Sequence, residues 1–591
     1  MQSPELRKKF LAFFEKHGHT TVPSSSLIPD DPSVLLTTAG MQQFKPYYTG
    51  DADPMHDFGS KSTASVQKSF RTSDIDETGD ETHLTFFEML GNFSFGGYFK
   101  KEAITYAFEF ITKELGLDIS YVTIFSGSDV VPKDEESRNI WQSLGVKDIR
   151  EEGMEDVFWG PTGSAGPCGP TTEIYCKNAN GKDVEIWNIV FNEFFFPGSR
   201  EELLSGTSGK KLEPLKEPGV DTGMGIERLV MIAQKKKNIF ETDLFDFIFP
   251  YLPNHLTERI ARIVADHLRG TTFLLADGVR PSNKEAGYVL RRLIRRVFVY
   301  AHTNGISHET LEKIIDEIIE RYGGFYSELV KEASSIREEF AEEREKFAHT
   351  LGRGVRELKK FKEHSEVIDS QRAFGLYETF GIPYEIIKEL GGETARTLTR
   401  TGFDEEFKKH QEKSRAGSEA KFGGHGLYLK TGEVTIRDAS EVEKVTRLHT
   451  ATHLMHAGLR AILGPEVRQD GSDITFERTR FDFRFGRKVT HEELKKVQEW
   501  VSNAVKKNAS VKWEEMSYEE ALKEGALGFF KAKYPPRVKV YTVFDPATGE
   551  SYSKEFCGGP HVAHTGEIGK FTILKEESSS AGIRRIRAKV E

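Results

Sequence analysis

Cysteine is scarce in this chain, with 3 residues among 591. A secreted fold held together by disulfides needs far more, so the sequence excludes that class and fits a reducing compartment. Long apolar runs are also missing, and the first ten residues, MQSPELRKKF, contain no apolar signal segment. These absences predict a soluble, cytoplasmic protein that does not contact a membrane.

An excess of positive charge is lacking too. The 82 Lys and Arg residues are outnumbered by 92 Asp and Glu, for a net charge of −10. This balance is not typical of a nucleic-acid binder, but phosphate contacts are local and need only a basic stripe. We find no internal repeat and no low-complexity segment, which excludes a solenoid.

The length of 591 residues exceeds what one hydrophobic core normally supports, so we expect several domains. Residues 1–240 mix β-favouring runs with Gly and Pro clusters, which predicts an α+β domain. Residues 241–420 show helical periodicity among charges. Residues 421–444 are Gly-rich and predict a linker or a reduced β-unit, and 445–591 predict a second α+β domain.

Four potential metal ligands occur in two short motifs, HTATH and CGGPH. His449 and His453 are four residues apart, so on a helix both imidazoles lie on one face. Cys557 and His561 can supply a thiolate and a third imidazole, which together make a tetrahedral zinc set. The alternatives are a packed or solvated histidine pair and a core cysteine; the joint presence of all four favours a metal.

A basic stripe occurs in YVLRRLIRRVFVY. Arg291 and Arg295 are four residues apart, as are Arg292 and Arg296, so a helix carries these guanidinium groups on neighbouring turns. Phosphate binding and a simply solvated helix face are both consistent with this spacing.

Two further segments suggest ligand contact. In VDTGMGIERL, glycines precede Arg228, and this combination allows close approach and grip of a phosphate; an ordinary turn before a helix is the alternative. In HLTFFEMLGNFSFGGYFK, aromatic residues alternate with Gly and polar groups, which predicts a hairpin and loop whose aromatics are more often core than cofactor contacts.

Several long motifs resemble the alanyl-tRNA synthetase family, in the family's order. They are SSSLIPDDPSVLLTTAGMQQFKPYYTG, HLTFFEMLGNFSFGGYFK, GPCGPTTEI, EIWNIVF, DTGMGIERL, ADGVRPSNKEAGYVLRRLIRR, HTATHLMH, RFDF and CGGPHVAHTGEIG. The resemblance extends from about residue 5 to the last residue of the sequence. It implies a class II synthetase domain with an antiparallel sheet flanked by helices, a helical tRNA-recognition domain and an α+β zinc-containing editing domain.

The resemblance also implies roles in joining alanine to ATP, which is bound with Mg²⁺. Arg71 would hold the α-phosphate, Met89 would line the adenine pocket, and Arg228 would pair with the terminal phosphates. The predicted alanine pocket consists of Trp159, Asn188, Val190, Asp221 and Gly223, with Asp221 taking the substrate ammonium. Gly223 would also border the ATP.

For tRNA(Ala), the resemblance implies recognition of a G·U wobble pair in the acceptor stem. Asn283 matches the family's residue for this contact, and Glu378 stands where the family normally has Asp. Phosphate contacts would come from Arg291, Arg292, Arg295 and Arg296.

The family's C-terminal module is not found, so we expect either a compact enzyme or a shortened chain. We also expect a monomer whose tRNA binding is sensitive to salt.

The last domain resembles the editing domain that hydrolyses mischarged seryl- and glycyl-tRNA(Ala). Editing is needed because a pocket that fits a methyl group rejects glycine and serine weakly. The sequence leaves open whether the zinc ion is catalytic or structural. Departures from the family are Thr82 in place of Arg, Pro560 in place of Thr, and the absence of the Gly-rich β-segment before HTATH, which leaves the serine or glycine preference open.

Three functions are consistent with the sequence. The first is a complete alanine–tRNA ligase with editing, and the second is a trans-editing deacylase with an inactive synthetase domain. The third is a non-enzymatic RNA-binding regulator. The presence of Arg71, Asp221 and Arg228 favours the first, because a decayed site loses charged residues.

Overall fold

The computed structural model describes residues 1–591 except 32–33, 207–208, 410–426, 429–434, 437–440, 528–536, 558 and 581–582. The chain divides into two compact units, Met1–Phe407 and Lys408–Glu591. The boundary predicted at 240/241 lies inside the first unit, and most of the predicted linker 421–444 lies outside the described residues.

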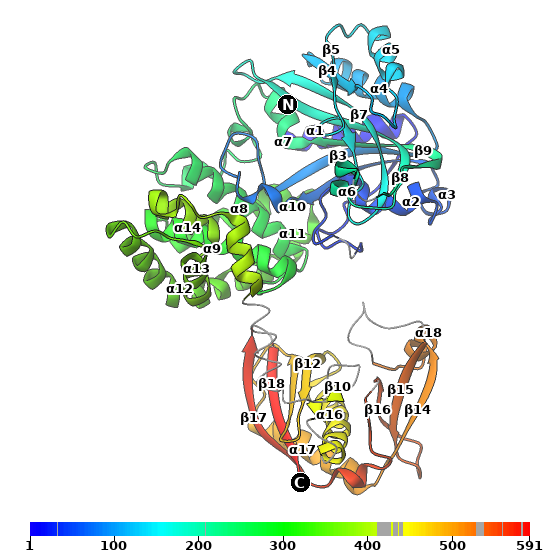
Figure 1. The fold of residues 1–591 in the computed structure, drawn as a ribbon, viewed down its shortest axis with the longest axis vertical. Helices are drawn as coiled ribbons and strands as arrows, with labels where there is room; N and C mark the ends of the chain where they lie inside the picture. The colour runs from blue at the N-terminus through cyan, green and yellow to red at the C-terminus, as the bar shows by residue number, and fades with distance from the viewer. Residues whose placement is uncertain are drawn as a thin grey trace. The chain divides into compact units, whose positions relative to one another are not determined.

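The first unit is built on one mixed sheet (Figure 1). Its strands, in spatial order, are β1 (Thr20–Thr21), β2 (Ser62–Phe70), β3 (Phe86–Phe95), β9 (Glu213–Gly225), β8 (Asp183–Phe196), β7 (Gly166–Lys177), β4 (Tyr121–Phe125) and β5 (Ile149–Glu152), with β6 (Phe158–Trp159) paired to β7. The pairs β1–β2 and β4–β5 are parallel and the others are antiparallel. The predicted antiparallel class II sheet is therefore confirmed, with a parallel pair at each edge.

Strand β3 corrects the hairpin and loop predicted for HLTFFEMLGNFSFGGYFK. Its residues form one continuous strand between β2 and β9, and nearly all of them are buried. A central strand that is covered on both faces has no polar face, so its alternation of aromatic and small residues does not mark a turn.

Helices cover this sheet and continue beyond it. Those of the sheet region are α1 (Ser3–Lys16), α2 (Lys45–Thr49), α3 (Pro54–Phe58), α4 (Lys100–Glu109), α5 (Glu135–Ser143), α6 (Arg200–Ser205) and α7 (Ile226–Ala233). The helical region predicted after residue 241 contains α8 (Glu258–Ala276), α9 (Glu285–Asn304), α10 (His308–Gly323), α11 (Ser327–Lys331), α12 (Ala333–Glu363), α13 (Ser370–Phe380) and α14 (Tyr384–Gly391).

Helix α8 joins the two regions of the first unit. It begins at an N-cap, where Thr257 accepts a hydrogen bond from the Ile260 amide, and almost every residue after Ala261 is buried. It packs against β3 on one side and against α9 and α10 on the other. Helix α8 therefore lies in the interior of the unit, where one continuous hydrophobic core extends from Leu6 to Phe403.

The second unit is α+β, as predicted. Its elements are β10 (Leu427–Tyr428), β11 (Thr435–Ile436), α16 (Val442–Leu463), β12 (Arg468–Ile474), β13 (Thr479–Arg484), α17 (His491–Lys506), β14 (Ser510–Ser517), α18 (Tyr518–Lys523), β15 (Arg537–Phe544), β16 (Ser551–Phe556), β17 (Phe571–Ser580) and β18 (Ile583–Val590). One sheet has the order β12-β13-β18-β17 and another β14-β15-β16. Helix α16, which carries HTATH, packs against α17 and against β16.

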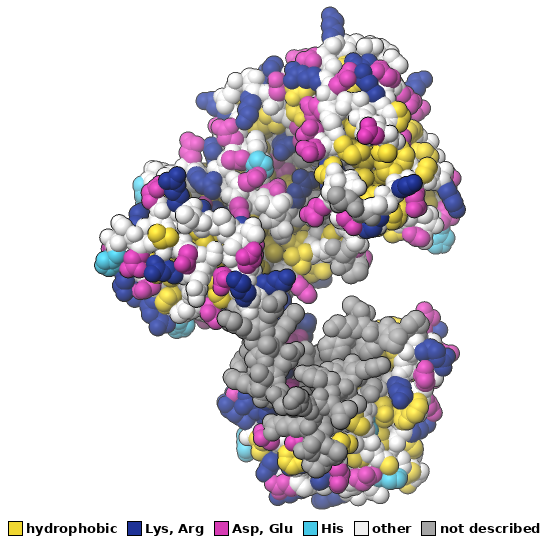
Figure 2. All heavy atoms as spheres, viewed as in Figure 1, with side chains coloured by type: hydrophobic (Ala, Val, Ile, Leu, Met, Phe, Trp, Pro, Cys, Tyr) yellow, Lys and Arg dark blue, Asp and Glu magenta, His cyan; other side chains and the backbone are white. Residues whose placement is uncertain are grey.

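Charges of both signs are mixed over the face in view in Figure 2, as the net charge of −10 suggests. Within the described residues, no helix has the length and apolar composition that a membrane span requires.

Candidate active site and metal centre

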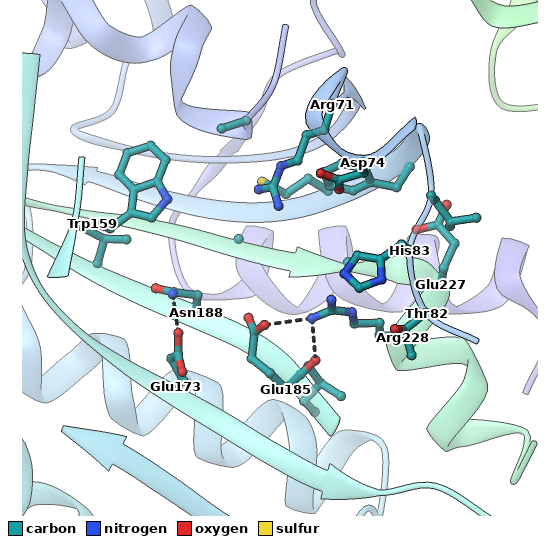
Figure 3. A pocket seen from close by; sticks show the side chains of 18 of the residues that line it. Arg71, Asp74, Thr82, His83, Trp159, Glu173, Glu185, Asn188, Glu227 and Arg228 are labelled. Carbon is teal, nitrogen blue, oxygen red and sulfur yellow. Dashed lines mark hydrogen bonds and ion pairs between the residues drawn. The ribbon is translucent and has the colours of Figure 1, made fainter. Parts of the chain in front are cut away.

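A pocket of the first unit lies against β3, β8 and β9 (Figure 3). It brings together every residue that the sequence assigned to ATP and alanine. These residues are Arg71, Met89, Trp159, Asn188, Val190, Asp221, Gly223 and Arg228.

The register of β8 and β9 explains how the predicted alanine-pocket residues meet. Asn188 pairs with Gly223 and Val190 pairs with Asp221, while residues two apart on one strand share a face. Gly223 keeps this face open, since a Cβ there would lie 3.0 Å from the Met89 sulfur. The strand pairing therefore places a carboxylate, an amide and a small apolar surface at one point.

Two cations lie in this pocket. Burial lowers the pKa of Arg71, and the charge of Arg228 lowers it further, although nearby carboxylates act in the opposite direction. The Arg228 Nη1 donates to the Glu185 carboxylate at 2.7 Å and to the Glu185 carbonyl at 3.2 Å. Because the two guanidinium groups repel each other, an anionic ligand between them would be stabilised.

Buried carboxyl groups form the other part of the pocket. Burial raises the pKa of Asp221 to about 8. Burial, followed by the charge of Glu185, raises the pKa of Glu173 to about 8. Asn188 Nδ2 donates to Glu173 at 2.8 Å, and the Tyr175 hydroxyl donates to it at 2.9 Å. A cationic ligand would restore the charged form of these groups.

Sequence reasoning left some pocket residues unassigned. These are chiefly Asp74, Thr82, His83, Glu173 and Glu185. Glu173 and Glu185 lie within GPCGPTTEI and EIWNIVF, so the motifs were found but not the roles of these carboxylates. Their pairing with Arg228 and Asn188 is a tertiary property.

The predicted metal ligands converge in the second unit. One ligand atom from each of His449, His453, Cys557 and His561 lies within 4.8 Å of the others. The Nε2 atoms of His449 and His561 each lie 3.4 Å from the Cys557 sulfur. Donor atoms of a tetrahedral zinc site, with bonds of about 2.0–2.3 Å, are roughly 3.3–3.8 Å apart, so these residues fit the ion.

Neighbouring groups orient the imidazoles. The Nδ1 of His449 lies 3.0 Å from the Pro560 carbonyl oxygen, and the Nδ1 of His561 lies 3.1 Å from the Thr450 hydroxyl. The Nδ1 of His453 lies 3.3 Å from the Glu555 carboxylate. Engaging Nδ1 in this way directs Nε2 toward a metal, as in most histidine metal sites.

Burial also favours metal binding by the histidines. It lowers the pKa of His449 to about 3, with a smaller contribution from His453, and lowers the pKa of His561 well below its usual value. The imidazoles are thus neutral at pH 7, and a neutral ring offers the lone pair that a metal requires. Gly559 must be glycine because a Cβ there would lie 2.3 Å from His449 Cε1.

The residues predicted to contact the wobble pair lie on the surface of the helical region. Asn283 precedes α9 and Glu378 is near the end of α13; both are exposed. Arg291 donates to the Asn283 side-chain oxygen. Arg295, one turn later, donates to the Gly381 carbonyl at 3.4 Å, so the two segments adjoin.

The four predicted phosphate-binding arginines of α9 do not share one face. Arg291 and Arg295 are partly exposed and both pair with Glu343. Arg292 is 9% exposed and Arg296 is fully buried. This corrects the expectation that all four form a phosphate-binding stripe, because two of them point into the protein.

Comparison with known proteins identifies the family to which this chain belongs. A family model described as tRNA synthetases class II (A) matches residues 5–457. An alanine–tRNA ligase of Borrelia hermsii is 43% identical over 621 residues, covering 100% of this chain and 99% of the relative. The chain belongs to the alanine–tRNA ligase family.

Other relatives of the family agree. The alanine–tRNA ligase of Treponema denticola is 44% identical, covering 99% of this chain and 98% of its own. That of Dehalococcoides mccartyi is 36% identical and is covered over 80% of its length. A second model, the threonyl and alanyl tRNA synthetase second additional domain, matches residues 538–587, which include Cys557 and His561. The resemblance predicted from the motifs is confirmed.

Proposed function

We propose that this protein ligates alanine to tRNA(Ala) at the expense of ATP and hydrolyses mischarged seryl- and glycyl-tRNA(Ala). The observation that carries the proposal is the pocket in which all eight predicted ATP and alanine residues meet. The editing activity is supported by the cluster of three histidines and one cysteine in the second unit.

In the first step, a carboxylate oxygen of alanine attacks the α-phosphorus of ATP, and pyrophosphate leaves as the bond to its bridging oxygen breaks. Asp221 would bind the alanine ammonium, and Trp159, Asn188, Val190 and Gly223 would enclose the methyl group. Arg71 would hold the α-phosphate, Arg228 the terminal phosphates, and Met89 the adenine. Catalysis then rests on positioning and on cationic stabilisation, since no general base is needed.

Mg²⁺ would enter with ATP. Hard carboxylate oxygens are its protein ligands, and Glu173 and Glu185 line the pocket with mutually unfavourable charges. A divalent cation relieves that repulsion and neutralises the pyrophosphate when bound.

For the transfer step, we propose that Asn283 and Glu378 recognise the wobble pair of the acceptor stem, with Arg291 and Arg295 as the neighbouring cations. Asn283 lies just before α9, the two arginines lie on α9, and Glu378 lies near the end of α13, which adjoins α9.

We expect a monomer in solution; a stable dimer in light scattering at micromolar concentration would contradict this expectation.

For editing, we propose that His449, His453, Cys557 and His561 hold Zn²⁺. The ion would order or polarise the site at which the ester of the mischarged tRNA is hydrolysed. A trans-editing deacylase with an inactive synthetase domain is not favoured, because the charged groups Arg71, Asp221 and Arg228 are present and line one pocket.

Alanine-dependent exchange between ATP and labelled pyrophosphate tests the ligase directly. We expect exchange with alanine and none without an amino acid. Hydrolysis of seryl-tRNA(Ala) without any exchange would instead support the deacylase alternative.

A further inference from the structure

The segment 71–85, here called the Arg71 loop, follows β2 and leads into β3. It contributes a large share of the nucleotide end of the pocket: Arg71, Asp74, Thr82, His83 and Leu84. Apart from the short helical turn η2 (Ser73–Ile75), it has no regular structure. Its conformation is held by hydrogen bonds within the loop, such as those from the Thr82 and His83 amides to Asp80, and by what the loop packs against.

Two arginines of α9 contact this loop. Arg296 Nη1 donates to the Ile75 carbonyl at 2.8 Å, and Arg292 Nη2 donates to the Asp76 carboxylate at 3.0 Å. These are the inward-facing arginines of the predicted phosphate stripe. The Arg296–Ile75 contact is fully buried, whereas in the other pair only Arg292 is buried and the Asp76 side chain is 44% exposed. Charge-assisted hydrogen bonds of this kind are directional.

Helix α8 holds the same loop at other points. A Cβ on Gly79 would lie 2.9 Å from side-chain atoms of Arg259 and Ile263, so the loop backbone rests directly on α8. At the end of the loop, Thr85 donates to Asp266 through its amide at 2.9 Å and its hydroxyl at 2.7 Å.

The anchors on α8 and α9 are joined to one another. His267 Nδ1 lies 2.8 Å from Asp266, and its Nε2 lies 3.2 Å from Arg296 Nη1. On the far side, Arg296 pairs with Glu389 at 2.9 Å, and Arg292 pairs with Glu385. Buried Glu385 has its pKa raised by burial but lowered more strongly by Arg292, Arg400 and Arg296, so its pKa lies well below the usual range. The Glu385 carboxylate and its arginine partners are therefore charged at neutral pH.

We propose that Arg292 and Arg296 are positioning residues for ATP: they fix the Arg71 loop against the helical region and so place its pocket side chains. This inference rests on the proposed function, because it assigns the pocket to ATP. According to this proposal, the two pairs of arginines on α9 have different roles. Arg291 and Arg295 face Asn283 and the surface, whereas Arg292 and Arg296 reach the loop.

ATP–pyrophosphate exchange without tRNA tests this, using the full chain and the variants Arg292→Gln and Asp76→Asn. We expect each to raise the KM for ATP by about tenfold, the effect of losing one charge-assisted hydrogen bond. The KM for alanine should change less than about twofold, because the alanine pocket is formed by strands rather than by the loop. Both variants lose the Arg292–Asp76 contact, and Arg292→Gln also loses the pair with Glu385. If Arg292 acts on the loop through Asp76, the double variant should raise the KM for ATP no further than Arg292→Gln alone.

The matched control is Arg344→Gln, which removes an arginine paired with Glu312 at 2.7 Å in the same helical region but away from the loop. It should leave both KM values unchanged. If exchange is unchanged and a parallel aminoacylation assay shows a raised KM for tRNA alone, the arginines contact phosphate and the proposal is overturned. Lower thermal stability with an unchanged KM for ATP would show a purely structural role and also overturn it.

If Arg292→Gln does not fold, Asp76→Asn carries the test, because it is isosteric and leaves the arginine in place. If the unmodified chain shows no exchange, the proposed function fails separately, and calorimetric ATP binding to the same variants decides whether the loop is positioned in this way.

Discussion

The Nδ1 nitrogen of His449 lies 3.0 Å from the carbonyl oxygen of Pro560. The interaction uses only the backbone of Pro560, and it directs the other ring nitrogen of His449 toward Cys557. A proline can therefore stand in CGGPH where the family has threonine, because every residue type supplies this carbonyl.

Replacing Gly559 should impair metal binding, whereas replacing Pro560 should not. In Gly559→Ala the new Cβ would lie 2.3 Å from His449 Cε1, so the ring must move. We expect zinc affinity to fall by about tenfold or more, measured by competition with a chelator. Pro560→Thr is the matched control and should retain its zinc; equal losses in both variants would contradict this account.

Cys557→Ala removes one of the four ligands. We expect zinc content after dialysis to fall to about a tenth or less, with deacylation of seryl-tRNA(Ala) lost. Because the ligands lie in the second compact unit and the alanine pocket in the first, alanine-dependent exchange should persist. Loss of both activities would point to an ion that is needed for folding of the whole chain.

Alanine binding should depend on pH through Asp221. Burial raises the pKa of this carboxyl to about 8, so it is protonated below that pH in the free protein. Binding an ammonium requires the carboxylate, and the KM for alanine should therefore rise as pH falls below 8, by up to about tenfold per unit. Steady-state exchange between pH 6 and 9 measures this.

Asp221→Asn provides the control for that profile. Its KM for alanine should be high and should lose most of the pH dependence. A profile unchanged in this variant would assign the titration to another group, of which Glu173 is the nearest choice since its pKa is also raised to about 8.

Asn283 and Glu378 are predicted to act together on the wobble pair. Alanylation of tRNA(Ala) with G·U and with G·C at that position should differ less in Asn283→Ala and in Glu378→Ala than in the unmodified chain. Losing one such contact costs about 1–3 kcal/mol of discrimination, while tRNA-independent exchange should stay unchanged. Full discrimination in Glu378→Ala would remove that residue from the assignment.

Some of the site followed directly from local sequence. The spacing of His449 and His453 predicted a shared helix face, and α16 provides it. The motifs around Arg71, Asp221 and Arg228 predicted pocket residues, and these residues meet. The histidine prediction rests on helix periodicity, which fixes which nearby residues share a face, whereas Arg71, Asp221 and Arg228 were predicted from the resemblance to the family.

The sequence did not predict β3 as one strand, nor the partners of Glu173 and Glu185. Alternating aromatics are ambiguous when a strand is buried on both faces, as β3 is. Burial, followed by the charge of Glu185, raises the pKa of Glu173. Asn188 donates a hydrogen bond to Glu173, and Arg228 pairs with Glu185. These contacts join different strands, so no local pattern encodes them.

For this protein, the sequence alone determined the family and the two kinds of chemistry and predicted the candidate ligand residues, because long motifs and short spacings carry that information. Only the tertiary structure decided which of the four arginines of α9 are buried and which are partly exposed. Their spacing is the same for both pairs, but packing against α8, α14 and the Arg71 loop turns Arg292 and Arg296 inward and leaves Arg291 and Arg295 partly exposed. The residues of a helix fix which side chains share a face, but the neighbouring elements decide which groups that face meets.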